Sequence, residues 1–159
     1  MQHLRITLAY TAPSTFDLDM TAFMLANDKY IPHENCMVYY HNLASADGSV
    51  KYVQENQSKY LDIDLRKTAK EIEEIYLVIS MYDAANRNQT FGKIPAVEVT
   101  ITDMDTNQKT HTYHLHTSFP NETAIELGRL FVRYDKWRWE TLSVGYKEGL
   151  EKFVNKYVF

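Results

Sequence analysis

Cysteine, glycine and proline are scarce in this sequence of 159 residues, and each shortage excludes a class of protein. Cys36 is the one cysteine, so no disulfide can join two parts of the chain, and a reducing, cytoplasmic location is expected. Five glycines and four prolines are scattered, which excludes a repetitive or low-complexity segment. The longest apolar runs span five residues, whereas a membrane-spanning helix needs about 20, so no membrane span is predicted.

Positive charge is also in short supply. Lysine and arginine number 17 against 21 acidic residues, which gives a formal net charge of −4 and a pI near 5.8. Proteins that bind nucleic acid present basic patches to the phosphates, so this balance argues against a nucleic-acid partner. With no linker or repeat in sight, the chain is predicted to form a single domain over residues 1–159.

Aromatic residues are plentiful, at 13% of the chain with twelve tyrosines, and they favour sheet. Period-two alternation of apolar and polar residues, which buries one face of a strand, dominates the pattern. Strands are predicted over residues 4–10, 16–20, 37–41, 50–53, 61–65, 97–101, 110–116 and 137–140. Residues 75–82 are apolar on both faces and predict a central strand. The predicted fold class is mostly β, a two-sheet β-sandwich with one or two short helices.

Helical spacing is limited to two places. Apolar residues between Leu65 and Ile75 are spaced for one short helix, and those between Tyr146 and Val158 predict an amphipathic C-terminal helix. Residues 122–134 are ambiguous, because their spacing suits a helix but Gly128 weakens it.

The sharpest candidate site is the pair of carboxylates at Asp17 and Asp19. In a strand these side chains point to the same face, about 6.5–7 Å apart. A hard cation such as Ca²⁺ between them would relieve their repulsion. Calcium takes six to eight oxygen ligands, so the pair is only part of a site, and a solvated strand face is the competing interpretation.

A polar loop, Asp83–Gly92, leaves the predicted central strand directly. Loops in this position commonly carry binding sites, and Arg87 and Gln89 are the candidate binding residues. The competing interpretation is a structural pair between Asp83 and an arginine that holds the loop in place.

Five segments, in order along nearly the whole chain, resemble the TerD family of bacterial tellurite-resistance and stress-response proteins. They are Phe16-Asp17-Leu18-Asp19 with Ala22-Phe23; Tyr40-His41-Asn42-Leu43 with Asp47-Gly48-Ser49-Val50; Ile63-Asp64-Leu65 before residues 75–80; Asp83-Ala84 with Arg87, Gln89, Phe91 and Gly92; and Glu122-Thr123-Ala124 with Gly128, Trp137, Val144-Gly145-Tyr146 and Gly149-Leu150.

The resemblance implies a β-sandwich, calcium binding, a cytoplasmic location and a role in resistance to tellurite or chemical stress. It also implies a strand over residues 125–134, followed by a hairpin at Asp135-Lys136. Carried over residue by residue, it implies that Asp17, Asp19 and Asp83 are calcium ligands. Asn42 and Asp47 are the second choices.

The sequence departs from the family pattern after the Asp-Gly-Ser turn. Typical members carry a glycine-rich, acidic loop that supplies much of the metal site, whereas residues 53–60 here are shorter and hold one carboxylate, Glu55, and one lysine, Lys59. Fewer anionic ligands weaken calcium binding, so a weak or lost calcium site is expected.

The predicted function is therefore a non-enzymatic stress-response or tellurite-resistance protein that binds, or acts as a scaffold for, an unidentified protein partner. The alternative is a small-molecule or oxyanion-binding protein that uses the loop Asp83–Gly92. A metal-dependent hydrolase at Asp17 and Asp19 ranks last, because no base or nucleophile accompanies the pair.

Overall fold

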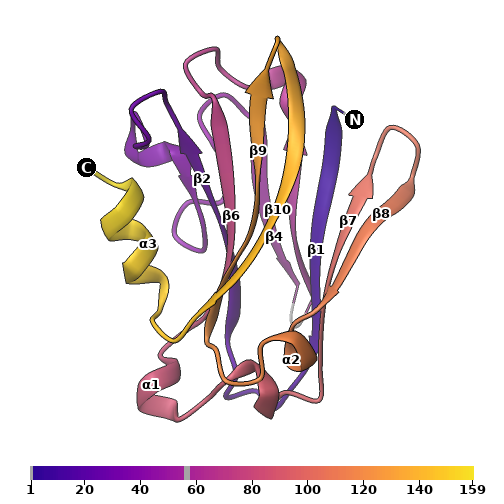
Figure 1. Cartoon of the computed structure of the whole chain (residues 1–159), viewed down its shortest axis with the longest axis vertical. Coiled ribbons are helices and arrows are strands. Elements are labelled where there is room, and N and C mark those ends of the chain that lie inside the picture. Colours follow the sequence, from indigo (N-terminus) through magenta and orange to yellow (C-terminus); the bar gives the residue numbers. More distant parts are fainter. Residues whose placement is uncertain (1, 56–57) are drawn as a thin grey trace.

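The computed structural model describes residues 2–55 and 58–159, and within them the chain forms two five-stranded antiparallel sheets (Figure 1). The first, here called the β1 sheet, has the order β4 (Val50–Glu55), β5 (Ser58–Asp64), β1 (His3–Thr11), β7 (Ala96–Asp103) and β8 (Gln108–His114). The second, here called the β6 sheet, has the order β10 (Lys136–Tyr146), β9 (Ala124–Arg133), β6 (Glu74–Met81), β2 (Leu18–Leu25) and β3 (Met37–Val38). The predicted mostly-β, two-sheet fold is confirmed.

Alternation in β1 explains how the β1 sheet contributes to the core. Leu4, Ile6 and Leu8 are fully buried, while Arg5 and Thr7 between them are only half-buried. The strand therefore turns one face toward the β6 sheet, as a period-two pattern dictates.

The two strands at the middle of the β6 sheet, β2 and β6, are covered on both faces. All eight residues of β2 are buried, as are seven of the eight in β6. Helix α3 (Leu150–Tyr157) covers the outer face, where the Tyr157 ring lies 5.1 Å from the ring of Phe23 and 5.0 Å from that of Tyr76 (Figure 1). The predicted central strand and C-terminal helix are both confirmed.

Two other short helices, α1 (Ala84–Arg87) and α2 (Leu115–Ser118), lie together at the end of the sandwich away from the N-terminus (Figure 1). Single 3-10 turns occur at η1 (Glu34–Cys36), η2 (Leu65–Lys67) and η3 (Phe91–Lys93). None of these helices, within the ranges that the structure covers, is long and apolar enough to cross a membrane.

The helix predicted between Leu65 and Ile75 is wrong. The chain makes only the turn η2, in which the side chain of Asp64 accepts a hydrogen bond from the backbone of Arg66. From Glu73 onward the backbone pairs with β2, beginning with the bond from the Glu73 amide to the Leu25 carbonyl. Sheet pairing therefore overrides a helical spacing of four apolar residues.

The strand predicted over residues 37–41 is shorter than expected and ends at Val38. Tyr39 and Asn42 close a tight turn through two backbone hydrogen bonds, which takes the intervening residues out of the sheet. The ambiguous segment 122–134 is resolved as strand β9, and its hairpin to β10 turns at Tyr134 and Asp135, both in the left-handed region. The strand implied by the family resemblance is thus confirmed.

Candidate functional site

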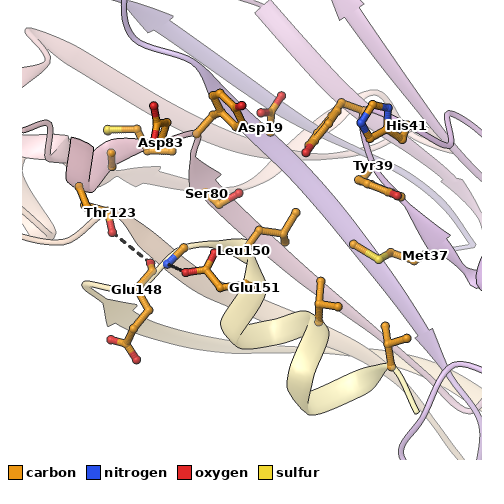
Figure 2. Close-up of a pocket in the computed structure, with 18 of the residues that line it drawn as sticks. Asp19, Met37, Tyr39, His41, Ser80, Asp83, Thr123, Glu148, Leu150 and Glu151 are labelled. Carbon is orange, nitrogen blue, oxygen red and sulfur yellow. Dashed lines mark hydrogen bonds between the residues drawn. The ribbon is translucent and has the colours of Figure 1, made fainter. Parts of the chain in front are cut away.

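A pocket of about 890 Å³ opens on the outer face of the β6 sheet, beside the start of α3 (Figure 2). Its lining comes from the start of β2, the end of β6 and the start of α1, from the chain between Ile31 and the turn after β3, from Thr123, and from the chain that runs from Lys147 into α3. A volume of this size is in the range of ordinary small-molecule sites.

Asp19 and Ser80 form the floor of the pocket. They are direct partners across β2 and β6 and are 8% and 4% exposed. Figure 2 shows the Ser80 side chain pointing into the space between Asp19 and Leu150. No hydrogen bond joins the Ser80 hydroxyl to any other residue that the structure describes. The residue is buried but its hydroxyl is not fully enclosed, so an unpaired polar group is open to the cavity.

Aromatic side chains form the wall opposite α3. The rings of Tyr39 and Tyr40 lie 5.2 Å apart, and the Tyr40 ring lies 4.4 Å from the imidazole of His41. Partial burial raises the pKa of Tyr40, with a further contribution from the charge of Asp19. Tyr40 is therefore a neutral phenol at physiological pH, and its ring face is available to a ligand.

The charges around the pocket are mostly negative. Among the lining residues described, one lysine, Lys147, stands against five carboxylates. These are Asp19, Glu34, Asp83, Glu148 and Glu151.

Two of these carboxylates are already engaged at the start of α3. Glu151 accepts a hydrogen bond from the Gly149 amide at 3.1 Å, and Glu148 pairs with Lys152 at 2.7 Å, which lowers the pKa of Glu148. The hydroxyl of Thr123 donates to the Glu148 carbonyl and ties this segment to the sheet (Figure 2).

Asp19 is the most buried of the five carboxylates, and it is held by a lysine from the opposite sheet. The ammonium group of Lys59, in β5, lies 3.3 Å from Asp19 Oδ1 and also donates to the Leu18 carbonyl. Burial raises the pKa of Asp19, and the charge of Lys59 offsets only part of this effect. Lys59 therefore does not fully offset the cost of burying the charged form of Asp19.

Asp17 does not join Asp19 in one site. It precedes β2, is exposed, and lines a second, more open hollow with Ser14, Thr15, Arg87 and Gln89. The prediction that the two carboxylates share a face of a strand is wrong, because the strand begins only at Leu18.

The structure divides the predicted binding loop Asp83–Gly92 between two places. Asp83 adopts a left-handed conformation before α1, lines the large pocket, and lies 3.6 Å from Arg87. The side chains of Arg87 and Gln89 both donate to the Thr15 carbonyl, at 2.9 and 3.0 Å. The loop is therefore fastened to the β1–β2 connection, which matches the competing interpretation of a structural arginine.

Asn42 and Asp47, the second-choice ligands, have structural partners. The Asn42 amide donates to the carbonyls of Asn35 and Met37. The Asp47 carboxylate accepts from both hydroxyls of Ser45 and Ser49 at 2.7 Å and from the Ala69 amide at 2.9 Å. The side chains of Asn42 and Asp47 therefore stabilise turns through these hydrogen bonds.

These five residues do not fit a calcium site. Asp19 is paired with Lys59, Asp17 lies in another hollow, and Asn42 directs its amide nitrogen to carbonyl groups. Within residues 2–55 and 58–159 no group of three or more His, Cys, Asp or Glu side chains is placed to hold a metal ion. Residues 56 and 57 of the reduced loop lie outside the described residues.

Sequence reasoning missed most of the pocket. Ser80 carried a signal, since it is the one polar residue in the apolar run from Ile75 to Met81 apart from the tyrosine hydroxyl at 76. The contribution of Glu148 to Glu151 had no local signal, because it depends on where α3 packs against the sheet.

Comparison with known proteins identifies one family. The TerD domain family matches residues 1–157. The tellurium resistance protein TerD of Serratia marcescens is 29% identical over 168 residues, covering 99% of this chain and 88% of that protein. General stress protein 16U of Bacillus subtilis (strain 168) is 28% identical over 158 residues, covering 95% and 82%.

A solved structure supports the same architecture. A homologue of the telluride resistance protein TerD from Streptomyces coelicolor A3(2) superposes with a TM-score of 0.80, covering 96% of this chain and 94% of that one. This superposition shows that the fold is shared. At 14% sequence identity, the similarity carries no further argument about function.

Proposed function

Because the chain belongs to the TerD family, whose relatives carry names of tellurium and general stress resistance, we propose that it is a non-enzymatic binding protein of the stress response. Its site is the pocket between the β6 sheet and α3. The observation that carries the proposal is the unpaired Ser80 hydroxyl, which opens into a cavity of about 890 Å³ beside the buried carboxylate of Asp19.

The chemistry of the lining supports binding over catalysis. A hydrolytic site needs a nucleophile within hydrogen-bond reach of a base. Among the described lining residues, the Ser80 hydroxyl has no such partner, and the Asp19 carboxylate is engaged by Lys59. The pocket offers shape, charge and aromatic surface, which are the features of recognition.

Calcium binding stays a prediction, in its weaker form. Of the first-choice ligands that the family resemblance implies, Asp19 and Asp83 line the large pocket and Asp17 lines the other hollow, so a calcium ion would have to rely on a few oxygens. A ligand set of that kind gives millimolar affinity at best.

The oxyanion alternative has less support than binding at the large pocket. The side chains of Arg87 and Gln89 already donate hydrogen bonds to the Thr15 carbonyl. The carboxylates of the large pocket repel an anion. A protein partner, expected from the sequence, remains a prediction as well.

Survival of the host under potassium tellurite tests the proposed function. A strain without the gene is complemented with the normal chain, with Ala85→Trp or Leu150→Trp, which fill the pocket, or with Val132→Trp, a matched control at an exposed position near the end of strand β9. We expect only the pocket-filling variants to lose protection while the melting temperatures of all purified variants remain close. Full protection by both filled variants would sink the proposal.

A further inference from the structure

We propose that the pocket between the β6 sheet and α3 binds a small organic cation, whose positive group sits at Asp19 and Ser80 and whose apolar body packs against the aromatic wall. This inference rests on the proposed function, since it names the ligand class of the same site. It differs from the calcium prediction, because the ligand is an amine or guanidine with a hydrocarbon body.

The charge of the lining selects the sign of the ligand. Five carboxylates and one lysine line the pocket within the described chain. Three of these carboxylates have a cationic partner, because Lys59 pairs with Asp19, Arg87 with Asp83 and Lys152 with Glu148. Glu34 and Glu151 have no ion pair among the described residues, so the lining keeps an excess of negative charge. A cavity with low-dielectric walls concentrates such a potential, so cations are attracted and anions repelled.

The floor supplies acceptors for a positive group. Asp19 and Ser80 are adjacent across β2 and β6, and both are more than nine-tenths buried. A hydroxyl without a hydrogen-bond partner can accept from an ammonium or guanidinium N–H, and a carboxylate does so more strongly. Burial raises the pKa of Asp19 and Lys59 offsets only part of this, so a cation bound beside this carboxylate would further favour its charged form.

The walls require a hydrocarbon or aromatic body. Tyr39, Tyr40 and Tyr82 line the pocket, and a cation within about 6 Å of an aromatic ring face is attracted to it, as the Arg87 guanidinium already is at 5.2 Å from the centre of the Tyr82 ring. Met37 lies beside Tyr39, and the opposite side is aliphatic, formed by Leu150, Val154 and Val158 (Figure 2). A fully hydrated inorganic ion gains nothing from these surfaces, whereas an amine with an apolar body buries itself against them.

Calorimetric titration of the purified full chain tests the inference with three probes of similar shape. Benzylamine, which is protonated at neutral pH, carries the positive charge and N–H donors, benzyl alcohol is neutral, and phenylacetate is negative. We expect the cation to bind at least tenfold more tightly than benzyl alcohol, and phenylacetate to show no binding. Raising the salt concentration should weaken binding of the cation alone.

Variants assign the binding to the floor of the pocket. Ser80→Ala and Asp83→Asn should each weaken cation binding severalfold, and Glu140→Gln, on strand β10 outside the pocket lining, should leave it unchanged. Asp19→Asn should weaken it most, and Ser80→Ala keeps the test decisive if the Asp19 variant folds poorly.

The two proposals fail in different ways. Equal affinity for the three probes, or preference for phenylacetate, overturns the organic-cation inference and leaves a binding pocket in place. No binding of any probe, together with lost tellurite protection in the filled variants, also overturns the inference but not the proposed function. If Leu150→Trp keeps both tellurite protection and binding of the cation, the proposed function and the organic-cation inference are both overturned.

Discussion

The ammonium group of Lys59 crosses from one sheet to the other and lies 3.3 Å from a carboxylate oxygen of Asp19, with both side chains almost completely buried. A buried ion pair stabilises little by itself, but removing one partner leaves the other charge buried and unpaired. The pair therefore contributes more to the relative placement of β5 and β2 than to the free energy of unfolding.

Replacing only one partner should be costly. We expect Lys59→Met to lower the free energy of unfolding by about 3–5 kcal/mol, as for other broken buried pairs. The double variant Asp19→Leu with Lys59→Met should lose less than the sum of the single losses, because no unpaired charge remains. Urea denaturation of the four proteins measures this difference, and strictly additive losses would contradict the coupling.

A buried carboxylate under α3 should make stability fall as pH rises. Burial raises the pKa of Glu126 above its ordinary 4.5, and the Lys156 ammonium, 4.0 Å away, offsets this in part. The tyrosines at 76, 146 and 157 also face it and are neutral here. Since the folded chain holds the proton more tightly than the unfolded chain, the free energy of unfolding decreases from pH 4.5 up to the raised pKa and then levels off.

The variant Glu126→Met should remove this pH dependence. We also expect it to raise the free energy of unfolding at pH 7 by about 1–3 kcal/mol, because an apolar group of similar length replaces a buried charge. Thermal melts between pH 4 and pH 8 measure both effects. A variant with the same pH profile as the normal chain would show that another group is responsible.

Asp47 should have the opposite pH behaviour. Burial alone would raise its pKa, but hydrogen bonds from Ser49, Ala69 and Ser45 outweigh this and leave the pKa below 3.8. Its contribution to stability is complete above pH 3.8 and is lost as the pH falls through the lowered pKa. We expect Asp47→Ala to cost at least about 1.5–3 kcal/mol, the value of one charge-assisted hydrogen bond. Exposed Asp17→Asn is the matched control, and an equal melting temperature for both variants would contradict the role of Asp47.

Gly128 should resist substitution because two neighbours occupy the space of a side chain. A Cβ there would lie 2.5 Å from the Glu140 carbonyl oxygen and would overlap the ring of Trp139. We expect Gly128→Ala to destabilise by about 1–3 kcal/mol through forced displacement of strand β10. Val132→Ala on the same strand is the control, and circular dichroism melts compare the two. A neutral Gly128→Ala would mean that the hairpin moves freely.

Calcium should stabilise the chain only slightly. Adding calcium at about 1 mM or removing it with EDTA should shift the melting temperature by no more than about two degrees, because a ligand near its dissociation constant adds only about 0.4 kcal/mol. A clear rise with calcium, abolished by Asp17→Asn or Asp19→Asn, would contradict this and restore the family-derived ligand set.

The sequence predicted the fold well because its signals were local. Alternation around Ile6 and the two-sided run from Ile75 depend only on neighbours along the chain, and both placed their strands correctly. The helix expected after Leu65 does not form, because the chain at Glu73 pairs instead with Leu25. Leu25 lies 40 residues before Leu65, and the spacing of apolar residues along one segment carries no information about so distant a partner.

The site was less predictable for the same reason. Asp19 was singled out from the sequence as a candidate calcium ligand, but its partner Lys59 comes from the other sheet. Arg87 and Gln89 were chosen from the sequence for their residue type. The structure shows that their side chains donate hydrogen bonds to the Thr15 carbonyl. The spacing of residues along one strand does not predict which distant group will lie beside a charged side chain and neutralise it.

Helix α3 supplies one wall of the pocket and is anchored on the sheet by Tyr157. Any occupant that touches both β2 and α3 must therefore slow the detachment of this helix, because detachment dismantles the occupant's own site. Resistance of the segment after Gly149 to proteases thus becomes a gauge of occupancy. It could be read in a crude extract, before the ligand has been isolated.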